Sequence, residues 1–307
     1  MTEYSVPKPT FTQSLEGRFL RLAASGLIPA RWYQPTLPQP QPKQAPLSLE
    51  IVSHCWNYAH LLVYQLSSLV NYPPKKLRVT MTVFYNSEDT RTQELLNYFT
   101  SLEVENVTWN WRELPKQALF RRAIGRNLAA KQTQADWVWF TDCDLLFQDD
   151  CLEALSAQLE GRTDRLVYPQ MERCTSLLAN DDPMLKPAAK PQVMQINTSQ
   201  FEEYPRTRAT GPLQITHGDV ARACGYCDAL SYYQQPSATW CKAYEDRAFR
   251  WLLRTQGTPL DIPGVFRIRH IHKGRYTGSA TQSKIRTSLR RLSSWWKEKR
   301  RHQHNRS

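Results

Sequence analysis

The chain has 307 residues, of which 41% are hydrophobic and 22% charged, and it carries a formal net charge of +12. This composition is typical of a globular protein long enough for one large α/β domain or two small ones. No stretch reaches the roughly 18 uninterrupted apolar residues of a membrane-spanning helix, and the N-terminus lacks the basic and apolar regions of a secretion signal. We therefore expect a cytosolic protein.

The excess positive charge is concentrated near the C-terminus. Residues 284–307 hold nine Lys or Arg and one acidic residue, a net of +8, which leaves +4 for the rest of the chain. Since the globular part also lacks a nucleic-acid motif, we expect no nucleic-acid partner. Ile285, Leu289, Leu292 and Trp296 follow a helical stripe among these charges. The stripe is equally compatible with a helix at the inner face of an anionic membrane and with a solvated or disordered basic end.

The seven cysteines are an odd number and are scattered along the chain. Cys224 and Cys227 have a metal-like spacing that His217 or Cys241 would extend to a zinc site. A second close ligand pair is missing, so free thiols in a reducing compartment are the simpler interpretation.

The first 47 residues precede the regular part of the chain. Residues 12–26 have the spacing of a short amphipathic helix, with Leu15, Phe19 and Leu22 on one face. Six prolines within residues 29–46 then exclude regular structure. They predict an extended linker that either wraps around the domain or stays free.

Strand-like and helix-like segments alternate in the next hundred residues. The hydrophobic pattern predicts strands at 49–53, 77–84, 107–111 and 137–141, and helices at 59–70, 90–99 and 119–131. Such alternation is typical of βαβ units and a mostly parallel sheet flanked by helices. Sheets of this kind bind ligands outside the carboxyl ends of their strands.

The second half is less regular. We expect a helix that starts near Asp149, a strand at 166–168, a helix at 248–253 and a last strand at 265–272. Residues 175–208 are rich in Pro and polar residues and show little periodicity, which predicts a substrate loop.

Two carboxylates, Asp142 and Asp144, follow the apolar strand at 137–141. If the strand pleat continues, both side chains point the same way and reach one centre. Hard oxygen ligands of this kind suit Mg²⁺ or Mn²⁺ bridging a diphosphate. Alone, the pair is equally compatible with a structural turn, because turns favour acidic residues.

A cationic helix precedes these acids. Arg121, Arg122, Arg126 and Asn127 lie on it among apolar positions. A cationic helix that leads into an acidic strand end indicates a site for a nucleotide diphosphate.

Three later motifs complete the pattern: Arg222–Asp228, Tyr244–Phe249 and Val265–His272. In this order, behind the cationic helix and the two acids, they resemble GT-A glycosyltransferases, particularly the family-2-like group and the β-1,4-galactosyltransferases. The likeness covers residues 48–275.

The resemblance implies an α/β GT-A fold, Rossmann-like, with a mostly parallel central sheet flanked by helices. It divides the chain into the N-terminal helix and linker of residues 1–47, a glycosyltransferase domain, and a basic amphipathic tail at 276–307. Within the domain, residues 48–150 would bind the donor and residues 151–275 the acceptor.

The resemblance also implies roles for the acidic and cationic residues. Arg122, Arg126 and Asn127 would bind the donor. Asp142 would approach the donor ribose or the metal, and Asp144 would ligate Mn²⁺ or Mg²⁺.

On the acceptor side, Glu245 and Asp246 match the acidic pair, with Asp246 as the catalytic base. Trp240 lies nearby in the sequence and would stack on an acceptor sugar. Both acids also suit the first turn of any helix, where the dipole favours negative charge.

The last strand would supply a histidine to the metal, with His270 the better match and His272 the alternative. Two departures stand out. Tyr85 or Asn86 occupies the place of an aspartate that often holds uracil in the family, and Arg267 replaces a methionine ligand of the galactosyltransferases. A cation at that position suits a diphosphate better than a metal.

These residues predict transfer of a sugar from a nucleotide-diphosphate sugar to a hydroxyl acceptor, on a glycan or lipid-linked molecule, with inversion. A metal would neutralise the leaving diphosphate while a carboxylate takes the acceptor proton. One alternative is a nucleotidyltransferase that forms nucleotide-sugars. Another is a non-catalytic basic module that binds membrane or nucleic acid.

Overall fold

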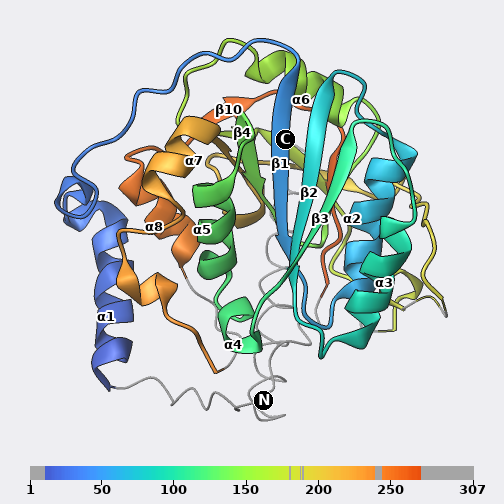
Figure 1. Ribbon diagram of the computed structural model, residues 1–307, viewed down its shortest axis with the longest axis horizontal. Coiled ribbons are helices and arrows are strands. Elements are labelled where there is room, and N and C mark those ends of the chain that lie inside the picture. The colour runs from blue at the N-terminus through green and yellow to red at the C-terminus, as the bar shows by residue number, and fades with distance from the viewer. Residues whose placement is uncertain (1–10, 180, 187, 189, 239–243, 271–307) are drawn as a thin grey trace, which may run out of the picture.

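A seven-stranded sheet with strand order β10-β6-β9-β4-β1-β2-β3 forms the centre of the molecule (Figure 1). Its strands are β1 (Leu47–His54), β2 (Leu77–Tyr85), β3 (Val107–Glu113), β4 (Trp137–Phe140), β6 (Leu166–Pro169), β9 (Gln214–His217) and β10 (Thr258–Leu260). The neighbouring strands run parallel except where β9 pairs with β4 and β6. The predicted mostly parallel α/β sheet is confirmed. The computed structural model describes residues 11–179, 181–186, 188, 190–238 and 244–270.

The two middle strands are apolar because both faces of the sheet are covered. All four residues of β4 are buried, as are all residues of β1 except Ser48. This continuous burial explains why these strands read as apolar runs and not as alternating patterns. The core therefore extends from one helix layer through the sheet to the other.

The helices are α1 (Phe11–Leu22), α2 (Ala59–Asn71), α3 (Thr90–Thr100), α4 (Lys116–Leu119), α5 (Arg122–Gln132), α6 (Cys151–Leu159), α7 (Gly218–Cys224) and α8 (Glu245–Leu252). Helices α2 and α3 pack together, as do α5 and α7, and α5 lies against β1. The helix predicted at 119–131 is confirmed from Arg122 onward as α5, but its start is wrong, because the backbone of Arg121 leaves the helical region (φ −108°, ψ 87°) and separates α4 from α5.

The chain reverses its direction across the sheet between β3 and β4. Strands β1, β2 and β3 are consecutive neighbours, whereas β4 returns to the other side of β1. Ligands of open α/β sheets bind at such a switch point, outside the carboxyl ends of the strands. Asp142 and Asp144 follow β4 at this place.

A four-stranded sheet lies beside the first, with order β5-β11-β7-β8. Its strands are β5 (Leu145–Phe147), β7 (Met171–Cys174), β8 (Glu202–Pro205) and β11 (Val265–Arg267). The strand predicted at 265–272 is therefore too long. Beyond Arg267, Ile268 donates its N–H to the Asp144 carbonyl at 2.9 Å, and His270 forms only an isolated bridge with Leu178.

The N-terminal segment wraps around the domain, as one of the two predicted alternatives has it. Arg247 of α8 donates to the Ala24 carbonyl at 3.0 Å. Further along the linker, the Gln41 N–H donates to Asp219 at 3.1 Å, and Lys43 accepts from Gly161 at 2.8 Å. Figure 1 shows α1 at the edge of the molecule beside α8. From the N-terminal helical segment the linker crosses the molecule to β1.

The predicted apolar face of the first helix exists but points outward. Leu15 and Phe19 are each 46% exposed and Leu22 is 56% exposed. Leu20 and Ala23 are buried instead.

Within the described ranges, no helix is both long and apolar enough to span a membrane.

The cysteines with metal-like spacing serve the core. Cys224 and Cys227 are buried, and burial raises the pKa of both thiols. His217 caps α7 by accepting the Asp219 N–H, and Cys227 donates to the Glu245 carbonyl at 3.3 Å. Across the described residues the cysteines are free thiols, and no three His, Cys, Asp or Glu side chains are grouped as a metal site. Cys241 lies outside the described residues.

Candidate active site

The two acids after β4 lie in a turn. Residues 143–144 form the turn, closed by a hydrogen bond from Leu145 N–H to the Asp142 carbonyl at 3.1 Å. The strand pleat thus ends before Asp142, and the expectation that pleating aligns the two carboxylates is wrong. Cys143 enters the core between them, and Gln65 of α2 donates to the Asp142 carbonyl at 3.0 Å.

The Asp142 carboxylate is held by the cationic helix that precedes it. Arg122 donates to Asp142 Oδ1, and Arg126 Nη2 lies 3.4 Å from the same oxygen. The two arginines are four residues apart on α5 and therefore share one face of the helix. This face meets the carboxyl end of β4, as the sequence predicts.

Arg122 also reaches the second acidic motif. Its Nε atom lies 3.3 Å from Glu245 Oε1, so one guanidinium bridges the donor-side and acceptor-side acids. Burial alone would lower the pKa of Arg122, but Asp142 and Glu245 raise it above its ordinary value. The site therefore keeps a permanent cation between two carboxylates.

A second connection runs through residues for which the sequence offers little signal. Arg126, fully buried, donates to the Tyr226 hydroxyl at 2.8 Å, and this hydroxyl donates to Gln214 at 2.8 Å. Gln214 in turn donates to the Asp246 carbonyl at 3.0 Å. Burial raises the pKa of Tyr226, which keeps its hydroxyl protonated and able to donate. A buried polar chain thus joins the two halves of the site.

Glu245 and Asp246 begin α8 and differ in their surroundings. The Glu245 side chain is 2% exposed, whereas the Asp246 side chain is 29% exposed. Asp246 Oδ2 lies 3.3 Å from Arg250, one helical turn later. Within the described part of the chain, Glu245 Oε2 is buried without a hydrogen-bond partner. The helix start therefore presents one accessible carboxylate and one buried, partly unsatisfied one.

Other predicted donor residues hold neighbouring loops. Asn127 donates to Asp228 at 2.8 Å and accepts the Tyr226 N–H at 2.9 Å. Asn86, at the position of the expected uracil-binding acid, donates to the Leu114 carbonyl at 2.8 Å. These amides therefore position backbone segments around the site.

The histidine motif is only partly described. The His270 ring packs edge-on against Tyr58, with centroids 5.5 Å apart. Arg267 binds the buried Glu172 at 2.6 Å, so its charge is paired within the smaller sheet. His272 and Trp240 lie outside the described residues.

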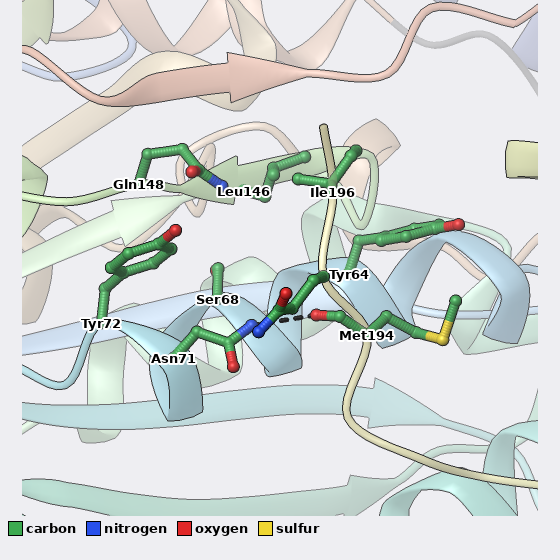
Figure 2. A pocket seen from close by; sticks show the side chains of 9 residues that line it. Tyr64, Ser68, Asn71, Tyr72, Leu146, Gln148, Met194 and Ile196 are labelled. Atoms are coloured by element: carbon green, nitrogen blue, oxygen red, sulfur yellow. Dashed lines mark hydrogen bonds between the residues drawn. The ribbon is translucent and has the colours of Figure 1, made fainter. Parts of the chain in front are cut away.

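A polar cavity of about 240 Å³ lies between α2 and the predicted substrate loop. It is lined by Tyr64, Ser68, Asn71, Tyr72, Leu146, Gln148, Met194, Gln195 and Ile196. Asn71 and Ser67 bind both backbone groups of Met194, at 2.9 and 2.8 Å, and so fix the loop to the helix. Figure 2 shows Tyr72 and Gln148 near one end of the cavity and Tyr64 with Ile196 near the other.

The solved structures similar to this chain include a mannosyltransferase and two complexes of TarS 1–349. Mannosyltransferase PcManGT from Pyrobaculum calidifontis, in complex with GDP-Man and Mn²⁺, is 15% identical with a TM-score of 0.44, over 94% of this chain and 76% of that one. TarS 1–349 from S. aureus is 12% identical in its UDP complex, with a TM-score of 0.45 over 72% and 60% of the chains. Its UDP-GlcNAc complex is 13% identical, with a TM-score of 0.43 over 76% and 62%. No curated protein matches the sequence.

The family match covers the donor side of the site and ends before Glu245 and Asp246. The model of glycosyl transferase family 2 matches residues 51–224, more than half of the 307 residues. This span contains the central strands, the cationic helix and the acidic turn. It confirms the resemblance to family-2-like GT-A enzymes and decides against a nucleotidyltransferase or a non-catalytic module. The chain belongs to glycosyl transferase family 2 and is a glycosyltransferase.

Proposed function

We propose that this enzyme transfers a sugar from a nucleotide-diphosphate sugar to a hydroxyl acceptor, with inversion and with Mn²⁺ or Mg²⁺, during assembly of a glycan, polysaccharide or glycolipid. The observation that carries the proposal is the convergence of Arg122 on both Asp142 and Glu245. It joins the cationic helix, the acidic turn and the acidic helix start at one place beside the switch point of the sheet.

The donor diphosphate would bind at the cationic end of α5. Arg122 is 20% exposed, so its guanidinium is accessible there and matches phosphate oxygens in geometry and charge. Arg126 is fully buried and keeps Asp142 in position. A bound diphosphate would then replace part of the contact between Arg122 and Asp142.

The acids of the turn fit a divalent cation in their donor chemistry. Asp142 and Asp144 offer hard carboxylate oxygens at the edge where the diphosphate would lie. Asp142, Asp144 and His270 do not form a three-ligand group in the structure, so His270 would have to approach the turn, or His272, outside the described residues, would complete the set. The cation supplies neutralisation of charge on the leaving diphosphate.

Asp246 would take the proton from the acceptor hydroxyl. Its carboxylate is the accessible member of the acidic pair, and Arg250 holds it in place. Glu245, with one oxygen on Arg122 and the other unpartnered among the described residues, would orient the acceptor hydroxyl, with Trp240 stacking on the sugar. Attack on the anomeric carbon from the side opposite the diphosphate inverts its configuration.

The experiment that tests the proposed function is hydrolysis of a panel of nucleotide-sugars with and without Mn²⁺, read as released nucleoside diphosphate. We expect turnover of at least one donor that requires metal and is lost in Asp144→Ala. Asp261→Ala is the matched control, because Asp261 is exposed and lies apart from the turn in sequence. Equal turnover in Asp144→Ala and the control would contradict the metal role, and absence of turnover with every donor would contradict the donor class.

The cavity beside α2 would hold a further sugar unit of the acceptor. Its lining contains hydroxyl, amide and aromatic groups and no charged side chain, which suits a neutral saccharide. Leu146 and Gln148 follow Asp144 by two and four residues of extended chain, which places them about 7 and 13 Å away. This spacing is within reach of an acceptor longer than one sugar.

Replacing Gln148 by Ala should raise the acceptor KM about 2- to 10-fold and leave kcat near the native value, because one hydrogen bond is lost equally in ground and transition states. Initial rates against acceptor concentration measure this effect. Gln170→Ala, at an exposed position outside the cavity, should leave KM unchanged. A fall in kcat without a change in KM would contradict the subsite.

The basic tail would attach the enzyme to the inner face of an anionic membrane through residues 284–307, which lie outside the described residues. Eight net positive charges over this segment support the proposal. A lipid-linked or membrane-proximal acceptor would then be within reach.

A further inference from the structure

The exposed large apolar side chains of the described residues gather in one short segment. Leu15, Phe19, Leu22, Leu27 and Trp32 are between 46% and 70% exposed. The first three share one side of α1 by their spacing, and the five together are named the N-terminal apolar face. Isolated exposed apolar residues are normal, but a group of them within 18 residues marks a surface for a partner.

The segment that carries this face is fixed to the domain by its small residues. A Cβ atom at Gly17 would overlap the Tyr232 hydroxyl, so α1 lies directly on that ring. Ala24 is buried, and Trp251 of α8 donates to the Ile28 carbonyl at 2.9 Å. Gly17, Ala23 and Ala24, together with Leu20, thus face the domain, whereas Leu15, Phe19 and Leu22 form a second apolar side that the domain does not cover.

The charges around the face are mainly positive. Arg18, Arg21 and Arg31 are exposed, and Glu16 is the one acidic residue between positions 15 and 32. Arg21 also lies over the Tyr244 ring at 4.2 Å, which anchors it at the border of the face. Large apolar side chains bordered by arginines are typical of surfaces that enter the headgroup region of an anionic bilayer.

The same charges disfavour the other candidates for covering this face. A second copy would place the same arginine-rich surface against this one, so that like charges meet across the contact. The tail at 284–307 carries a net +8 and would meet like charge. An anionic lipid surface complements both the apolar and the cationic groups.

We propose that the N-terminal apolar face docks the enzyme on an anionic lipid bilayer. Apolar side chains of α1 and of the helical turns after it enter the outer acyl region, and Arg18 and Arg31 contact phosphates. Helix α8, which packs against this segment, begins with Glu245 and Asp246. Docking therefore holds the acceptor-side acids one helix layer from the lipid. Docking on the bilayer does not depend on which donor or acceptor the enzyme uses.

The test is co-sedimentation of the full chain with vesicles of phosphatidylcholine alone and of phosphatidylcholine mixed with phosphatidylglycerol. We expect binding to the anionic vesicles that falls at least about tenfold in Leu15→Ser/Phe19→Ser/Leu22→Ser, since each apolar side chain that enters lipid contributes on the order of a tenfold factor. These side chains are exposed, so the variant should keep the native melting temperature.

Two further sets of variants test the arginines of the face and separate its binding from that of the C-terminal tail. Arg18→Ser/Arg31→Ser should weaken binding to anionic vesicles, whereas the exposed Arg91→Ser on α3 should not. In a chain without residues 284–307, the three serine substitutions should remove the binding that remains. Unchanged binding of the serine variant would overturn the proposal. So would a native dimer that the serine variant converts to monomer while vesicle binding persists.

Discussion

Replacing Asp246 by Asn is expected to lower kcat about 10²- to 10⁴-fold, the range for loss of a general base, while donor affinity stays close to the native value. The amide preserves the size of the side chain but cannot take the acceptor proton. Asp246 is expected to carry this role because its carboxylate is 29% exposed at the start of α8. Single-turnover rates at saturating donor measure the effect without product release.

Glu245→Gln is the matched substitution at the neighbouring acid and should behave differently. Glu245 neutralises Arg122, so its loss leaves the guanidinium more available to a diphosphate and should tighten donor binding. The acceptor KM should rise, because the unpartnered Oε2 no longer presents a charge. If Asp246→Asn keeps more than a tenth of kcat while Glu245→Gln loses it, Glu245 and not Asp246 is the base.

Replacing Glu172 by Ala is expected to lower the free energy of unfolding by about 3–5 kcal/mol, the usual cost of removing one partner from a buried ion pair. The Glu172 side chain is fully buried in the smaller sheet between Arg206 and Arg267. Without its carboxylate, two guanidinium groups remain in partly buried positions with fewer partners. Thermal or urea unfolding followed by circular dichroism measures the change.

Glu203→Ala is the control for this prediction on the neighbouring strand. Glu203 pairs with Arg173 at 2.9 Å, but the two side chains are 57% and 52% exposed. Water screens such a surface pair, so its loss should cost about 0–1 kcal/mol. Equal destabilisation by the two substitutions would show that burial of Glu172 adds nothing to the strength of its contacts.

The predicted elements before residue 141 agree closely with the structure because their signal is local. Strand β1 and helix α2 extend the predicted segments by at most two residues at an end. Alternation of apolar strands and amphipathic helices is imposed by burial on both faces of the sheet, so it appears in any window of the chain. Element ends were less predictable, as at Arg121, whose side chain donates to the distant Gln235 carbonyl, and at Arg267, where the pairing of β11 with β5 and β7 stops.

The candidate site divides in the same way. The cationic helix and the two acids after β4 could be identified from their order in the chain. Tyr226 and Gln214 could not, because a tyrosine and a glutamine carry no motif until the fold brings both beside Arg126. Arg250 was also missed, although its spacing of four residues from Asp246 on a helix is a signal that could have indicated the ion pair.

By itself, the sequence determined the α/β class, the order of the elements and the chemistry available at the carboxyl end of β4. These properties follow from periodicity and residue type, which act over a few residues. Only the tertiary structure decided that Arg122 bridges Asp142 and Glu245, 103 positions apart, and that Leu15, Phe19 and Leu22 face outward. Both depend on which surfaces meet after folding, and an amphipathic pattern specifies an apolar face without specifying what covers it.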